Sequence, residues 1–87
     1  ADFLFSGPMP EPIPILFGRQ IRRRRESAGL SQEALADSAG ITRNYVGMIE
    51  RGEANPTLIV LHDLAAALGV SMCAVVSELE TQIAEES

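Results

Sequence analysis

The sequence predicts an all-α domain of five short helices, and three observations support that fold class. From residue 15 onward, apolar residues recur at the intervals of three and four that place them on one face of a helix. Hydroxyl residues and glycines interrupt this pattern at the positions where helices begin and end. No stretch alternates apolar and polar residues at the interval of two that is typical of a strand.

The first fourteen residues are expected to form an extended, proline-rich leader. Proline occupies positions 8, 10, 12 and 14, and each proline fixes its own φ and disfavours the α region for the preceding residue. Two interpretations stay open: a loose leader, or an arm that lays Phe3, Leu4 and Phe5 on the domain or on a partner. Pro14 can also be the first residue of the helix that follows, where its missing N–H costs little.

The folded domain is expected over residues 15–80. Its first helix carries Phe17, Ile21 and Ala28 on the inner face and ends at Gly29. The second to fourth helices lie between Ser31 and Gly40, Thr42 and Gly52, and Thr57 and Gly69, and the fifth begins after Ser71. The apolar residues expected on the second to fourth helices are Leu35, Ala36, Ala39, Val46, Ile49, Leu58, Leu61, Leu64, Ala65 and Leu68. Residues 81–87 are expected to form an acidic C-terminal tail.

The charge of the chain is divided unevenly along its length. The formal net charge is −5, yet all seven basic residues are arginines between Arg19 and Arg51. That window also holds four acidic residues, which leaves it at +3, while the other eight acidic residues lie outside it. The middle of the chain therefore keeps a positive field that the net charge conceals.

The composition argues against a membrane protein and against an enzyme. No apolar run approaches the ~20 residues that span a bilayer. A single cysteine, Cys73, excludes an intrachain disulfide and suits a cytoplasmic protein. With His62 as the one histidine, the chain offers no His/Cys metal set and no nucleophile with a base, so neither catalytic residues nor cofactors are expected.

The second and third helices are separated only by Gly40, Ile41 and Thr42, a connection so short that the helices must cross steeply. The segment GLSQEALADSAGITRNYVGMIERGEANPTLIVLHDLAAALGV, residues 29–70, closely resembles the phage-repressor (Cro/XRE-type) helix-turn-helix family. The likeness extends from about Ile15 to Leu79. It implies a compact repressor-like domain, similar to small autonomous regulators such as restriction–modification controller proteins.

The run Arg22 to Arg25 is not expected to form one cationic patch. Successive helix residues turn by about 100°, so the four side chains point around the whole helix and one must face inward. In the resembled family, the arginine four residues before the glycine of GLSQ pairs with the glutamate that ends the third helix. Here these residues are Arg25 and Glu50, while Arg22, Arg23 and Arg24 are left for solvent or phosphate.

The resemblance implies binding of double-stranded DNA, with the third helix in the major groove. The positions that match base-reading residues are Arg43, Asn44, Gly47 and Met48. Gly47 departs from the family, which usually has a polar side chain there, and either close backbone approach or simple tolerance explains it. The candidates for phosphate contacts are Gln32, Thr42, Tyr45, Arg19, Asn55 and Arg22, with Arg51 as a further one.

One such unit reads few base pairs, so a homodimer on an inverted repeat is expected. The apolar stripe assigned to the dimer interface is Met72, Val75, Val76 and Leu79 on the fifth helix, with Ile59 or Val60 as possible additions. The acidic tail is expected to point away from DNA. The alternative is an antitoxin-like or other protein-interaction module on the same scaffold, for which DNA binding is secondary. No small-molecule ligand is expected.

Overall fold

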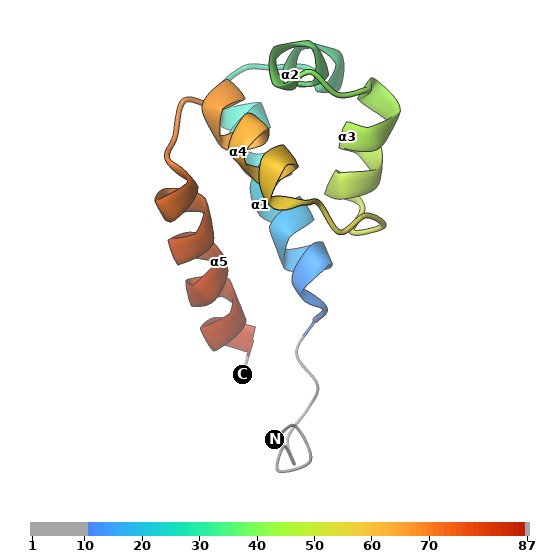
Figure 1. Cartoon of the computed structure of the whole chain (residues 1–87). Coiled ribbons are helices and arrows are strands. Elements are labelled where there is room, and N and C mark those ends of the chain that lie inside the picture. The colour runs from blue at the N-terminus through green and yellow to red at the C-terminus, as the bar shows by residue number, and fades with distance from the viewer. Residues whose placement is uncertain (1–10, 87) are drawn as a thin grey trace.

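The computed structural model describes residues 11–86, and within that range it contains helices and no strand (Figure 1). The helices are α1 (Ile13–Ser27), α2 (Gln32–Ala39), α3 (Arg43–Glu50), α4 (Leu58–Ala67) and α5 (Met72–Glu86). The prediction of an all-α, five-helix domain is confirmed. Phe3, Leu4 and Phe5, the residues of the suggested arm, lie outside the described residues.

Local chemistry sets most of the helix boundaries. At the start of each of α2 to α5, a serine or threonine hydroxyl accepts a hydrogen bond from the backbone N–H three residues later, at 3.0–3.2 Å. The four caps are those predicted, Ser31, Thr42, Thr57 and Ser71. At the end of α2, Gly40 has a φ of 72°, a left-handed conformation that a side chain would disfavour.

Both ends of the domain differ from the predicted boundaries. Helix α1 begins at Ile13 rather than residue 15, because the carbonyl of Pro12 already accepts from the N–H groups of Ile15 and Leu16, at 2.9 and 3.3 Å. Pro14 therefore lies within the first turn, where its missing N–H has no helical partner to lose. The expected acidic tail is helical as far as Glu86, and its Gln82 side chain donates to the carbonyl of Leu16 on α1 at 3.0 Å.

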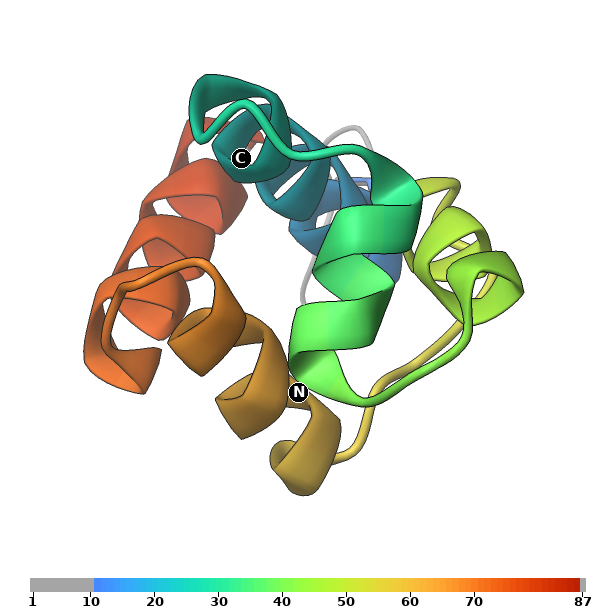
Figure 2. The same cartoon turned by 90° about the horizontal axis from the view of Figure 1, so that it is seen from above.

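One hydrophobic core holds the helices together. Helix α1 packs against α3 and α5, α2 against α3 and α4, and α4 against α5, so the helices surround a single centre (Figure 2). The buried cluster contains Phe17, Ile21, Leu35, Ala36, Ala39, Val46, Ile49, Leu64, Ala65 and Val75. Of the other residues expected on inner faces, Leu61 and Leu68 are half-buried and pack against this cluster, and two lie outside it. Ala28 is exposed at the end of α1, and Leu58, in the first turn of α4, is 75% exposed.

Helices α1 and α3 meet backbone to backbone at Gly18. A Cβ at this position would lie 2.2 Å from the carbonyl oxygen of Ile49 and 2.9 Å from that of Glu50. Only glycine allows this approach, which fixes α3 against the middle of α1. The sequence pattern did not single out Gly18.

Candidate nucleic-acid interface

The turn between α2 and α3 sets the direction in which α3 leaves the domain. Ala36 is 2% exposed at the contact between the two helices, and its carbonyl accepts from the N–H of Ile41 at 3.0 Å. Beyond Gly40, Ile41 packs on the core and Thr42 caps α3. The first turn of α3 is thereby presented at the surface.

The predicted base-reading residues occupy the outer side of α3. Arg43 and Asn44 are exposed in its first turn, and Met48 is half-buried one turn later. The Asn44 amide nitrogen lies 3.8 Å from the sulfur of Met48, so these two side chains are in contact. Gly47, in contrast, is buried, and the three atoms nearest to a Cβ placed there all belong to the Arg51 guanidinium.

Ion pairing separates Arg43 from the other arginines. Within residues 11–86, Arg43 is the one arginine for which no carboxylate partner is found, although the chain has seven arginines. The pairs are Arg19–Glu11, Arg22–Glu26, Arg23–Glu78, Arg24–Glu78, Arg25–Glu50 and Arg51–Glu53. The positive charge at the start of α3 is therefore available to an external anion or acceptor.

Arg25 and Glu50 form a bidentate ion pair between α1 and α3. The Nε and Nη2 groups of Arg25 donate to the two oxygens of Glu50 at 2.6 and 3.0 Å. The two side chains are only 11% and 4% exposed, and the hydrogen bond to Glu50 raises the pKa of Arg25 above its usual value. Gln32, a predicted phosphate ligand, donates its amide to the same carboxylate at 3.0 Å.

The remaining phosphate candidates are scattered. Arg19 and Arg22 are mostly exposed, at 57% and 64%, and each has a surface carboxylate partner. Tyr45 is half-buried and packs against the core. Asn55 is exposed on the loop before α4, at the edge of a hollow between that loop, α1 and α5. Of the predicted phosphate ligands, only Thr42 is therefore both exposed and at the start of α3, beside Arg43 and Asn44.

A polar network that the sequence did not reveal joins α1 to α5. Gln20 is fully buried, donates to the carbonyl of Val75 at 3.2 Å and to Gln82 at 3.3 Å, and accepts from Arg24 at 2.7 Å. Arg24 and Arg23, expected to face solvent or phosphate, both pair with Glu78. The available signal was the position of Gln20, which lies between Phe17 and Ile21 on the inner face of α1.

The residues assigned to a dimer interface have different surroundings. Val75 is 1% exposed and belongs to the core of its own protomer, so its assignment to the interface is wrong. Met72 and Leu79 are half-buried and pack against the same core. Val76 is 41% exposed, and of the four it is the one whose side chain is mainly directed outward.

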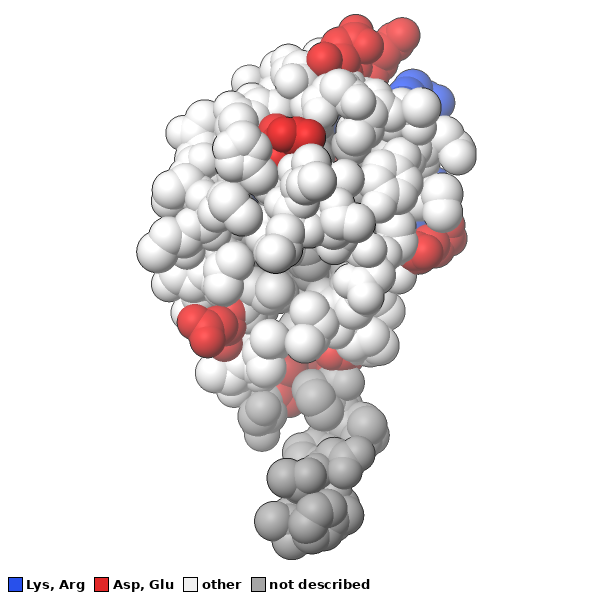
Figure 3. Space-filling model, in the orientation of Figure 1, with Lys and Arg blue, Asp and Glu red and all other residues white. Residues whose placement is uncertain are grey.

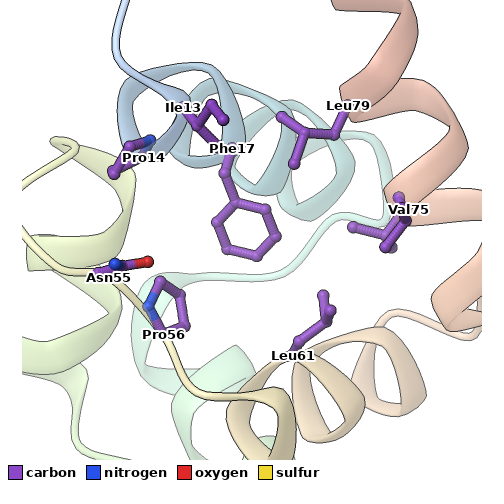
Figure 4. A pocket seen from close by; sticks show the side chains of 9 residues that line it. Ile13, Pro14, Phe17, Asn55, Pro56, Leu61, Val75 and Leu79 are labelled. Carbon is purple, nitrogen blue, oxygen red and sulfur yellow. The ribbon is translucent and has the colours of Figure 1, made fainter. Parts of the chain in front are cut away.

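Val76 is one of the residues that line an apolar hollow of about 130 Å³. Figure 4 shows this hollow with eight of its other lining residues labelled. Phe17 of α1, Leu61 of α4 and Leu79 of α5 point toward it from three sides, and Pro56 closes the loop side. Around it the surface carries few charges: Figure 3 shows a largely uncharged face over α4 and α5, with basic atoms only toward the side of α3. Other large apolar side chains exposed in the described residues are Ile13, Leu58 and Ile59, at 52%, 75% and 73%.

Other kinds of site find little support within residues 11–86. That range contains no group of three or more His, Cys, Asp or Glu residues able to hold a metal ion. His62 forms a surface contact of 3.2 Å with Asp63, and Cys73 is exposed. No single helix of the described chain has the length and apolar character to cross a membrane; α4 and α5 meet that test only as a pair, bent by 106°.

Comparison with known proteins gives a consistent result. A helix-turn-helix family model matches residues 21–75. The chain is 34% identical to control protein C.MunI of Mycoplasma sp over 71 residues, which cover 80% of this chain and 96% of that protein. It is 42% identical to the immunity repressor of Bacillus phage phi105 over 69 residues, 79% of this chain but only 47% of that repressor.

Solved structures show the same relationship. The restriction-modification controller protein C.AhdI from Aeromonas hydrophila superposes with a TM-score of 0.70 at 40% identity, covering 71% of this chain and 94% of that one. The clp gene regulator ClgR from Corynebacterium glutamicum gives a TM-score of 0.80 at 27% identity, covering 87% and 82%. The resemblance found in the sequence is confirmed: the chain belongs to the Cro/XRE-type helix-turn-helix family of DNA-binding transcriptional regulators.

Proposed function

We propose that this protein regulates transcription as a homodimer that binds an inverted-repeat operator, with α3 of each protomer in the major groove. The observation that carries the proposal is the isolation of Arg43. In a chain of net charge −5, six arginines have carboxylate partners, and the one without such a partner in residues 11–86 lies in the first turn of α3. The N-terminal part of the second helix is the part of a helix-turn-helix that contacts base edges.

The chemistry of the exposed side chains suits base reading. A guanidinium donates two hydrogen bonds to O6 and N7 of guanine, so Arg43 is assigned to a guanine. Asn44 can pair in a bidentate manner with adenine, and its contact with Met48 limits the directions that its amide can take. Met48 is apolar and suits a thymine methyl group.

Contacts to phosphate should be few. Thr42 and the exposed N–H groups of the first turn of α3 favour an anion. Arg19 and Arg22 lie in exposed ion pairs, which contribute little to stability and can therefore be exchanged for phosphate. The other candidates, Gln32, Tyr45 and Asn55, are uncharged, so phosphate contacts from them would add little to counterion release. The amide of Gln32 keeps one N–H beside the one bonded to Glu50, and Asn55 is exposed. We therefore expect a modest dependence of binding on salt, below that of ten phosphate contacts per dimer.

The largely uncharged face over α4 and α5 supports the dimer. It carries the exposed Val76 and the apolar hollow beside it, while Leu58 and Ile59 expose further apolar surface at the start of α4. A second copy that covers this surface would leave both α3 helices available to DNA. Half-sites about one helical turn apart, ~34 Å, would then match the twofold symmetry. In this proposal the protein acts in the cytoplasm.

The test is selection from a random duplex library at near-physiological salt, with the mass of the selected complex measured in solution. An inverted repeat bound by two chains is the expected result. A stable dimer that enriches no sequence would contradict DNA reading and favour the antitoxin-like alternative, in which a protein is the main partner.

The variant Arg43→Ala tests the assignment of bases. It should weaken operator binding by ~1–3 kcal/mol and relax the preference at one base pair of each half-site. Arg23→Ala is the matched control, because that arginine is also exposed but is paired with Glu78 on α5, and it should leave the preference unchanged. Equal weakening of Arg43→Ala on every sequence would make Arg43 a phosphate ligand instead.

A further inference from the structure

Residues 43, 47 and 51 form a stripe along α3. They are spaced by four, so each side chain direction is rotated by only about 40° from the one before. Arg43 is at the start of the stripe and Arg51 caps the end of the helix. Gly47 lies between these two arginines and has no side chain. The middle of this side of α3 therefore carries no side chain of its own.

The guanidinium of Arg51 covers this bare position. A Cβ built on Gly47 would lie 3.0 Å from Nη1, 3.9 Å from Cζ and 4.0 Å from Nη2 of Arg51. Side chains on a helix lean toward its N-terminus, so Arg51 reaches back over the turn that contains residue 47. Gly47 is buried, although the Arg51 side chain above it is 57% exposed.

The same guanidinium is paired with Glu53. Nη2 of Arg51 donates to the carboxylate of Glu53 at 3.1 Å, and this hydrogen bond raises the pKa of Arg51. Both side chains are more than half exposed, at 57% and 56%, so water screens the pair and it is easily exchanged. Glu53, which by itself would repel DNA, is neutralised locally by this arrangement.

We propose that Gly47 is a seat for the Arg51 guanidinium, and that a DNA phosphate replaces Glu53 as its partner when α3 enters the groove. The inference rests on the proposed function. Base edges are read near the start of a recognition helix, so a cation anchored at its end is better placed for the sugar–phosphate backbone. A guanidinium already positioned over the helix loses less conformational freedom on binding than a free arginine. Gly47 thus acts by positioning Arg51, and not as a base-reading residue.

The experiment measures the binding constant of the dimer for its selected operator by fluorescence anisotropy at several salt concentrations. Arg51→Gln should weaken binding roughly tenfold per chain, and so about a hundredfold for the dimer, as for the loss of one charged hydrogen bond in each chain. The slope of log K against log salt should fall by about 0.9 per chain, or about 1.8 per dimer. Arg51→Lys should retain most of the slope, and Arg23→Gln, the control outside α3, should leave it unchanged.

The variant Gly47→Ala distinguishes two roles of Gly47: a seat for the Arg51 guanidinium, and a position where DNA approaches the backbone of α3 directly. The added Cβ would displace the guanidinium, so binding should weaken in the native background and not weaken further in an Arg51→Gln background. Its melting temperature should be equal or higher, because alanine favours a helix more than glycine does. Glu53→Gln should strengthen binding several-fold when Arg51 is present and have little effect when it is not.

Three results would overturn the inference alone. One is an unchanged salt slope for Arg51→Gln on an operator that the native chain binds, which would leave the proposed function intact. The second is equal weakening by Gly47→Ala with and without Arg51, which would assign Gly47 to direct approach of DNA. The third is an equal gain from Glu53→Gln in both backgrounds, which would make Glu53 only a repulsive charge. Absence of any selected operator for the native chain would overturn this inference and the proposed function together.

Discussion

Replacement of Glu50 by alanine should destabilise the whole domain rather than its DNA-binding surface alone. Glu50 is 4% exposed and accepts two hydrogen bonds from Arg25 and one from Gln32. Removal of one partner of a buried pair costs ~3–5 kcal/mol, because the other charge is left without compensation. Two features reduce this cost for Arg25: its guanidinium keeps a hydrogen bond to the carbonyl of Leu30, and its side chain is 11% exposed, so water reaches it. We therefore expect a loss of about 3 kcal/mol in the free energy of unfolding, at the low end of that range.

Thermal unfolding followed by circular dichroism measures this effect. For a domain of this size, each kcal/mol lowers the melting temperature by about 4–8 °C, so Glu50→Ala should melt about 12–24 °C below the native chain. Glu53→Ala, which removes an exposed carboxylate three residues later, should melt close to the native temperature. The double variant Arg25→Met, Glu50→Leu should recover most of the loss, because it leaves no unpaired charge. A decrease of less than 3 °C for Glu50→Ala would refute the structural role assigned to the pair.

Three further predictions concern helix contacts and the dimer face. Gly18→Ala should lower the free energy of unfolding by ~1–3 kcal/mol in thermal melts, because its Cβ would clash with the carbonyl of Ile49; native stability would contradict the close approach of α1 and α3. Glu78→Ala should lower the melting temperature by a few degrees at low salt and less at high salt, since two arginines lose a partly exposed partner; an effect independent of salt would exclude ion pairing as its cause. Val76→Glu should halve the mass measured by light scattering without loss of helicity, while Ser77→Glu should not; a dimer that persists would remove Val76 from the interface.

The elements of this fold were predictable because their signals are local. The hydroxyl of Thr42 bonds to an N–H three residues away, and Gly40 needs a left-handed φ whatever the rest of the chain does. The Arg25–Glu50 pair, by contrast, joins residues 25 positions apart, and only the family resemblance brought it within reach of the sequence. Base-reading positions were inferred on the same ground.

The features that the sequence did not reveal depend on how helices pack. Gly18 is needed because a carbonyl of α3 lies where its side chain would be, and no pattern within α1 contains that information. Val75 lies on an apolar stripe that fits a partner helix as well as it fits a core. Only the position of α5 decides that it is buried in its own protomer. Residues 81–86 are acidic enough to resemble a tail, yet Gln82 anchors them to α1 through the carbonyl of Leu16.

The distribution of partners among the arginines links the charge pattern to function. The four consecutive arginines divide as the helical turn requires: Arg22 pairs within α1, Arg23 and Arg24 with α5, and Arg25 with α3. Most arginines of the segment from Arg19 to Arg51, whose net charge is +3, are therefore paired with nearby carboxylates. This segment does not create a broad cationic surface. A protein arranged in this way gains little affinity from phosphate alone. In the proposed dimer, discrimination among operators would then depend on the few groups at the start of α3 and on the geometry with which the two protomers present them.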